Sequence, residues 1–175
     1  MASADSRLGA LRGALLDLVG THGPETGGRV WSRDFRRFAI AVDDLDPIYF
    51  DDDAAVAAGY PASVAPPVFL SATMDFGHGP ALASLRPDGT GADRTSWLPL
   101  EGFRLMGGGQ DLAFHRPVLD GTEVRVRSTL ESVTEKEGRS GPFLLLGLRT
   151  TYRDEHGRPL VECDDTIIVR EEETP

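Results

Sequence analysis

The sequence is poor in the features that would tie the protein to an oxidising compartment or to a membrane. It contains a single cysteine, Cys163, so no intramolecular disulfide can form and a reducing compartment is favoured. Its apolar runs fall well short of the roughly 20 residues that a membrane-spanning helix needs. Residues 1–18 also lack the apolar core and small-residue cleavage site of a signal peptide. We therefore expect a cytoplasmic protein.

Basic residues are scarce as well, and this limits the class of partner. Lysine and arginine total 18 against 28 aspartates and glutamates, which gives a net charge of −10. A surface of this charge repels nucleic-acid phosphates and anionic lipids, so neither is expected as a partner. An anionic ligand would need a local group of arginines. Those available for one are Arg33, Arg36, Arg37, Arg104, Arg116, Arg125 and Arg127.

The first half of the chain carries helical patterns. Leucines at helical spacing near the N-terminus predict an amphipathic helix over about residues 6–20. A second helix should begin at Ser32 and end before Pro47, and an alanine-rich helix should follow over Asp51–Ala58. The aspartates that open this third helix are expected to stabilise its N-terminus rather than bind a metal, and no cofactor is expected. The apolar segment Val68–Leu85 predicts one buried helix, although two glycines and a proline interrupt it.

The second half of the chain carries strand patterns. Residues Thr122–Val133 alternate between apolar and polar side chains, as expected for a strand with one buried face. Strand-like runs also span Gly107–Val118, Phe143–Tyr152 and Thr166–Arg170, with turn sequences between them. Helices followed by an antiparallel meander predict an α+β fold. The length suits a single domain, residues 1–175, with the first helix as an extra N-terminal element.

Several stretches resemble one family of enzymes. Residues 38–49, FAIAVDDLDPIY, resemble the hydratase motif of MaoC-like proteins, in which Gly-Asp-x-Asn-Pro precedes a hydrophobic residue and a histidine. Residues 112–117, LAFHRP, are similar to a Phe-x-x-Pro strand of that family, and residues 154–157, DEHG, to its penultimate hairpin. The loop at 137–141 is similar to that of the N-terminal-type subfamily, the FAS1-like dehydratases. The resemblance covers residues 28–171 in order.

The resemblance implies both a fold and a class of activity. MaoC-like (R)-specific enoyl-CoA hydratases and β-hydroxyacyl dehydratases have a hot-dog fold, a curved antiparallel sheet wrapped round one long central helix. They work as homodimers or as heterodimers with a second hot-dog protein. Their substrates are acyl-CoA or acyl-carrier-protein thioesters, which bind at the dimer interface. Several members pair a catalytic subunit with one that has lost the catalytic residues.

The resemblance also places two residues at the catalytic positions. Asp44 takes the place of the family's aspartate and Tyr49 that of its histidine. Because tyrosine has a pKa of about 10, it is a poor base at neutral pH, although its hydroxyl can donate a hydrogen bond. The strongest base of the active members is therefore missing, and His78 is the one histidine that we consider as a replacement.

A second departure from the family lies just before the buried segment. Active members have His-Gly there, and a backbone N–H of this region holds the thioester oxygen, whereas this chain has two prolines, which have no N–H. Loss of one such donor costs about 10²–10³ in rate, and the N–H of Val68 is the nearest substitute. The residues expected to line the thioester site are Tyr60, Ala65, Pro66, Pro67, Val68 and Phe69.

Three functions stay open on these residues. The chain could be a subunit of a hydratase or dehydratase that leaves catalysis to its partner. It could be a self-sufficient thioesterase or specialised hydratase with Asp44 as the base. It could also be a module that binds acyl thioesters without chemistry. The plainest alternative for the acidic residues themselves is structural, since Asp43, Asp44 and Asp46 would end one helix and start the turn before Pro47.

Overall fold

One antiparallel five-stranded sheet forms the body of the computed structural model, which describes residues 6–73, 76, 82–85 and 95–171. Neighbouring strands follow one another across the sheet in the order β1-β3-β4-β5-β2, so β1 and β2 form its edges. The strands are β1 (Thr26–Arg29), β2 (Phe103–Phe114), β3 (Glu123–Gly138), β4 (Gly141–Asp154) and β5 (Pro159–Glu171).

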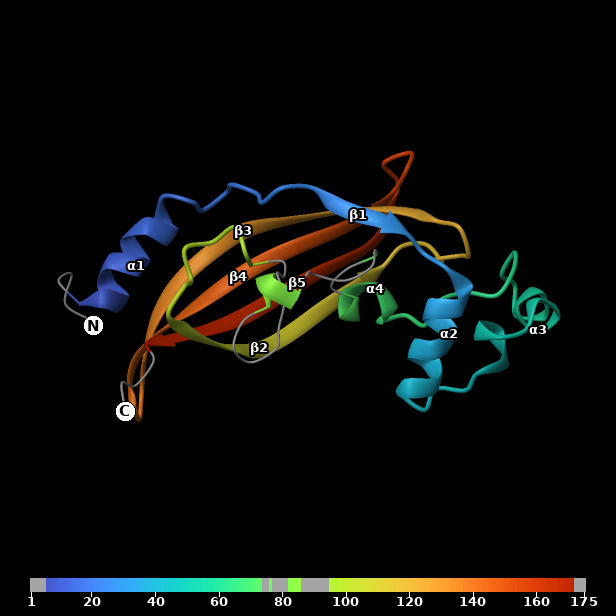
Figure 1. Ribbon diagram of the computed structural model, residues 1–175, viewed down its shortest axis with the longest axis horizontal. Coiled ribbons are helices and arrows are strands. Elements are labelled where there is room, and N and C mark those ends of the chain that lie inside the picture. The colour runs from blue at the N-terminus through green and yellow to red at the C-terminus, as the bar shows by residue number, and fades with distance from the viewer. Residues whose placement is uncertain (1–5, 74–75, 77–81, 86–94, 172–175) are drawn as a thin grey trace.

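Short helices accompany this sheet. They are α1 (Arg7–Leu16), α2 (Ser32–Ala41), α3 (Asp52–Ala57) and α4 (Phe69–Ala72), with the 3₁₀ turns η1 (Pro47–Tyr49) and η2 (Leu82–Ser84). Figure 1 shows the strands bent into an arch, with α1 at one end, α2 and α3 at the other, and α4 beneath the arch. Within the described ranges, no helix has the length and apolar character to cross a membrane. The curved antiparallel sheet with few helices confirms the predicted α+β, hot-dog class.

Alternation of side chains along the strands explains why one side of the sheet is buried. Every second residue of β3 from Val124 to Leu130 is buried, whereas the residues between them are more exposed, as the sequence predicts. The same holds for every second residue of β4 from Leu144 to Asp154. Directly paired residues of neighbouring strands share a face of the sheet, so these buried positions form one continuous surface. We call it the inner face.

Two clusters of buried side chains fill the inner face. In the first, Leu70 of α4 packs against Val126 and Tyr152 of the sheet. In the second, Leu15 of α1 packs against Leu146. Full burial of each such side chain is worth about 1.5–3 kcal/mol. The clusters therefore fix both helices on the same side of the sheet.

The helices differ from the predicted ones in two places. The buried helix expected over Val68–Leu85 is found, in the described residues, as the four-residue α4. It ends at Ala72. The C-cap residue, Thr73, has an extended ψ of 117°, and its hydroxyl donates to the carbonyl of Phe69 at 2.7 Å, a bond that competes with the helical ladder. The long central helix is thus not seen in this part of the chain. The first helix ends at Leu16, about four residues earlier than predicted.

Glycines shape two of the strands. Strand β1 contains Gly27 and Gly28, although glycine is depleted in strands. Gly27 of β1 has a φ of 148°, and a Cβ there would overlap the carbonyl oxygen of Val124, so the close approach requires glycine. Residues 107–109, GGG, lie within β2 at a bulge in its pairing with β5.

Candidate functional site

The acidic segment after α2 folds into a tight turn that gives its aspartates different roles. Asp43 has a φ of 58°, in the left-handed region that glycine adopts most readily, which accounts for the glycine at this position of the MaoC-like motif. Asp46 caps η1, since its Oδ1 accepts the N–H of Ile48 at 3.1 Å. The N–H of Asp44 donates to the carbonyl of Ala39 at 2.9 Å. The structural reading therefore suits Asp43 and Asp46 and leaves the Asp44 side chain for another role.

Asp44 and Tyr49, the predicted catalytic pair, contact each other. The Tyr49 hydroxyl donates to Oδ2 of Asp44 at 3.1 Å. Tyr49 is only 6 % exposed and packs in a small cluster with Ala39 and Val64. Burial, followed by the hydrogen bond to Asp44 and the negative charge of Asp44, raises the pKa of Tyr49 to about 12. The phenol is therefore protonated at neutral pH and acts as a donor.

A cavity of about 330 Å³ opens beside this pair. We call it the tyrosine cavity. Three of the predicted site residues do not lie in its wall, as far as the described residues show. Asp44 reaches the cavity only through Tyr49, and Val68 is 42 % exposed. Phe69 is buried in the core. Its wall does include five of the predicted site residues, namely Tyr49, Tyr60, Ala65, Pro66 and Pro67.

The opposite wall of the tyrosine cavity comes from a part of the chain that the sequence did not assign to the site. It consists of residues Phe114–Val118, at the end of β2, and Val161 of β5. The N–H of Ala65 donates to the carbonyl of Val118 at 2.8 Å and so joins the two walls. The resemblance of residues 112–117, LAFHRP, to the family identified this strand end. It did not predict that the strand end lies next to the acidic motif in space.

Arg36 of α2 ties the Asp44–Tyr49 pair to the cavity wall. Its Nε donates to the carbonyl of Tyr49 at 3.2 Å and its Nη2 to Oγ of Ser63 at 3.3 Å. The N–H of Ser63 in turn donates to Oδ1 of Asp52 at 2.8 Å, and hydrogen bonds from Ser63 lower the pKa of Asp52. One guanidinium thus fixes η1, the start of α3 and the loop that leads to the prolines.

The two prolines form the turn ahead of α4. Neither has an N–H, and the carbonyl of Pro66 accepts the N–H of Phe69 at 2.9 Å. The N–H of Val68 makes no hydrogen bond within the part of the chain that the structure describes. An oxygen atom placed at this turn would therefore find its nearest backbone donor at Val68.

The other ionisable candidates lie as follows. His115 lines the tyrosine cavity, and its Nε2 is 3.4 Å from Oε2 of Glu162. His78 lies outside the described residues. Asp51 caps α3, accepting the N–H of Asp53 at 2.7 Å, as expected for a helix N-terminus. Across the described ranges, no three His, Cys, Asp or Glu side chains come together as a metal site would require.

The curved antiparallel sheet with few helices is the fold of MaoC-like hot-dog proteins. The sequence pattern of the family described as FAS1-like, dehydratase domain region, matches residues 18–163. The UPF0336 protein SCO4636 of Streptomyces coelicolor is 30 % identical over 154 residues, which are 87 % of this chain and 93 % of that protein. The chain belongs to the FAS1-like dehydratase family of MaoC-like hydratases and dehydratases.

Solved structures agree with this fold. A chain of the ChsH1-ChsH2 complex from Mycobacterium tuberculosis matches with a TM-score of 0.72 at 20 % identity, over 95 % of this chain and 94 % of that one. A chain of the HadBC complex, a 3R-hydroxyacyl-ACP dehydratase of the same organism, matches with a TM-score of 0.57 at 23 % identity, over 82 % of this chain and 95 % of that one. Identities this low support the fold alone. Both proteins were solved as complexes of two components.

Proposed function

We propose that the chain is a subunit of an (R)-specific 2-enoyl-thioester hydratase or 3-hydroxyacyl-thioester dehydratase. It pairs with a second hot-dog protein that carries the complete Asp/His pair, and its ligand is an acyl-CoA or acyl-carrier-protein thioester. The observation that carries this proposal is the hydrogen bond from Tyr49 to Asp44 at the wall of the tyrosine cavity. On this proposal the chain keeps the layout of a dehydratase site, with a phenol where an imidazole would move the proton.

The chemistry explains why a partner is needed. Hydration of a 2-enoyl thioester requires a base for the water, an acid for the α-carbon and donors for the thioester oxygen. With a pKa of about 12, Tyr49 is ionised at pH 7 in about one molecule in 10⁵. It cannot take a proton from water at a useful rate. As a donor to Asp44 it holds the carboxylate in place and shapes the wall of the site.

The second requirement, a donor for the thioester oxygen, is also reduced in this chain. Pro66 and Pro67 stand where active members have the N–H, so only the N–H of Val68 is available at the turn. Loss of one such donor costs about 10²–10³ in rate. Together with the missing base, this assigns the chemistry to the partner and the binding of the acyl chain to this subunit.

We also propose that residues 1–175 form a single hot-dog domain with α1 as an addition. The support is that Leu15 of α1 packs on the same inner face as α4, through the second core cluster. A separate domain would bury its leucines within itself rather than against β4.

The experiment is hydration of crotonyl-CoA by the purified chain, followed as loss of the enoyl absorbance. We expect at most slow turnover by the chain alone and an increase in Tyr49→His, which rebuilds the Asp/His pair. Tyr60→His is the matched control. Tyr60 lines the same cavity, but in the described part of the chain the tyrosine bonded to Asp44 is Tyr49. Tyr60→His should not raise the rate.

Two outcomes would contradict the proposal in different ways. Full activity of the unmodified chain that disappears in Asp44→Asn would make it the self-sufficient enzyme. Saturable binding of thioesters with no turnover in any reconstituted pair would make it a binding module without chemistry.

A further inference from the structure

The inner face of the sheet is apolar along β5 except at one position. From Val161 to Val169 every second residue faces inward, and Asp165 is the one charged residue among these five. It pairs directly with Leu148, which is buried in the second core cluster, so the two share the inner face. Its Oδ1 accepts the Nε2–H of Gln110 at 2.5 Å. This hydrogen bond is exposed, and a carboxylate among apolar neighbours adds nothing to their packing, so its presence points to recognition.

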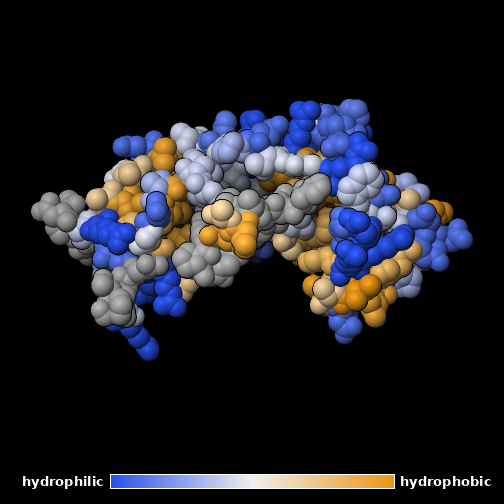
Figure 2. Space-filling view, in the orientation of Figure 1, coloured by the Kyte–Doolittle hydropathy of each residue, from blue (hydrophilic) through white to orange (hydrophobic). Residues whose placement is uncertain are grey.

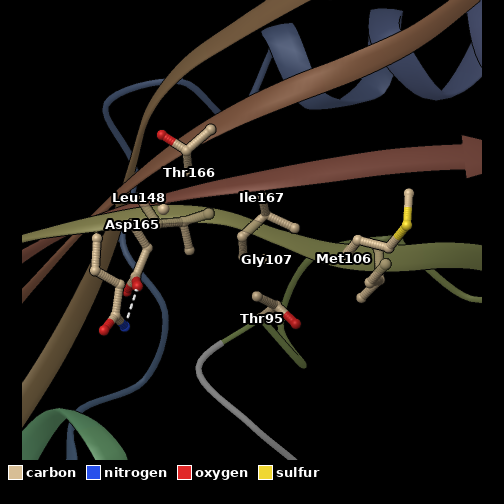
Figure 3. Close-up of a pocket in the computed structure, with 10 residues that line it drawn as sticks. Thr95, Met106, Gly107, Leu148, Asp165, Thr166 and Ile167 are labelled. Atoms are coloured by element: carbon tan, nitrogen blue, oxygen red, sulfur yellow. Dashed lines mark hydrogen bonds between the residues drawn. The ribbon is translucent and has the colours of Figure 1, made fainter.

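The Gln110–Asp165 pair lies in a second cavity, of about 500 Å³. We call it the glutamine cavity. Leu148 and Ile167 contribute apolar wall, and Gly107 adds no side chain. Figure 3 shows Asp165 on the same side of the strands as Thr95, which borders the cavity, whereas Met106 and Thr166 point to the other side. The cavity is therefore lined largely by apolar residues and glycines, with the Gln110–Asp165 pair and Thr95 among its polar groups.

The two cavities follow one another along the same strands. The directly paired Phe114 and Val161 line the tyrosine cavity, and Gln110 and Asp165 line the glutamine cavity. Four residues of strand separate the two pairs, which corresponds to about 13 Å at a rise of roughly 3.3 Å per residue. The pair between them on the inner face is Leu112 with Cys163, which is apolar. Both residues belong to the packing of the first core cluster, so an extended chain that passes from one cavity to the other would displace apolar side chains of that cluster.

We propose that the acyl chain of the bound thioester runs from the tyrosine cavity over Leu112 into the glutamine cavity. The Gln110–Asp165 pair then selects acyl chains that carry a hydroxyl about 13 Å along. This inference rests on the proposed function, which places the thioester beside Tyr49. A hydroxyl can donate to a carboxylate oxygen and accept from the amide of the glutamine, so it satisfies both members of the pair. An unsubstituted chain would remove water from the pair and replace none of its hydrogen bonds.

The test is calorimetric titration of the purified chain with ω-hydroxydodecanoyl-CoA and with dodecanoyl-CoA. We expect the hydroxylated ligand to bind at least about tenfold more tightly, the effect of one good hydrogen bond. Asp165→Leu should abolish or reverse this preference. Asp111→Leu is the matched control: it removes a carboxylate from the residue next to Gln110, on the opposite face of the strand, and should leave the preference unchanged.

A steric variant tests the path of the chain independently. A Cβ at Gly107 would meet no atom within 4 Å, so Gly107→Leu is tolerated by the backbone and fills the cavity. It should weaken binding of both dodecanoyl ligands and leave crotonyl-CoA unaffected, since a short chain ends within the tyrosine cavity. If Asp165→Leu fails to fold, as judged by near-UV circular dichroism, Gln110→Leu replaces it, because Gln110 is exposed.

The outcomes separate this inference from the proposed function. Equal affinity for the two long ligands overturns the selection by Gln110 and Asp165 and leaves the proposed function intact. Unchanged binding of long chains to Gly107→Leu overturns the path, again without touching the proposed function. Failure to bind any of the three thioesters, crotonyl-CoA included, overturns both.

Discussion

Removal of the Asp44 carboxylate should lower the pKa of Tyr49. The rise from 10.0 to about 12 corresponds to roughly 3 kcal/mol against the phenolate. Burial is the largest cause and persists in Asp44→Asn, whereas the negative charge is lost and the hydrogen bond becomes one to a neutral amide. We therefore expect the pKa of Tyr49 to fall in Asp44→Asn, but only part of the way back towards 10.0.

The chain is well suited to this measurement because it contains only three tyrosines, Tyr49, Tyr60 and Tyr152. With ¹³C at the Cζ of tyrosine, each ring gives one NMR signal that shifts on ionisation, and Tyr49→Phe assigns the signal. Asp46→Asn is the control: this carboxylate adds to the field at Tyr49 but does not bond it, and asparagine can still cap η1. A Tyr49 that titrates near 10, or one whose pKa ignores Asp44→Asn, would refute the reasoning.

The same pKa predicts how stability changes at alkaline pH. Since folding raises the pKa of Tyr49, the folded state favours the neutral phenol. Its contribution is fully present below pH 10 and is lost as the pH rises through the folded value of about 12. In this window the free energy of unfolding in urea should therefore fall for the unmodified chain by up to about 3 kcal/mol more than it falls for Tyr49→Phe. Parallel curves for the two proteins would contradict the burial and bonding of this hydroxyl.

Two further predictions concern the scaffold, both read as free energies of unfolding in urea. Leu15→Ala should lower the free energy of unfolding by about 2–5 kcal/mol, because the side chain is buried between α1 and the sheet. Leu16→Ala, at a position 42 % exposed, should lower it little. Equal losses would mean that α1 does not pack as described. Gly27→Ala should disrupt β1, because its Cβ would overlap the carbonyl oxygen of Val124, while Gly13→Ala in α1 meets no atom within 4 Å and should stabilise by about 0.5–1 kcal/mol. A neutral Gly27→Ala would place β1 away from β3.

The contact between Asp44 and Tyr49 could be predicted because it is local. Five residues separate the two, and Pro47 between them starts the 3₁₀ turn that brings the tyrosine back towards the aspartate. The far wall of the cavity could not be predicted in this way. The bond from Ala65 to Val118 joins segments more than fifty residues apart, and periodicity gives the face of a strand without naming what that face meets.

The same limit applies to the inner face of the sheet. Alternation in the sequence predicted which residues of β3 are buried, and the structure confirms them. It gave no reason to single out Asp165, which sits in a run of acidic residues beside Asp164. Only the pairing with Leu148 shows that Asp165 faces inward, while Asp164 forms an exposed ion pair with Arg149. The register between strands, which depends on the whole sheet, decides which of the two adjacent carboxylates faces inward.

The two departures from the active family members act on different atoms of the reaction, and this gives a last prediction. Tyr49→His restores a base for the water, and Pro67→Gly restores an N–H for the thioester oxygen. Because the losses are independent, their effects on the free energy of the transition state should add, so that the rate gains multiply in the double variant. If Pro67→Gly adds nothing to Tyr49→His, the Val68 N–H already holds the oxygen. If Tyr49→His adds nothing to Pro67→Gly, then Asp44 is not positioned to share a water with a histidine, and the subunit's site is one for binding alone.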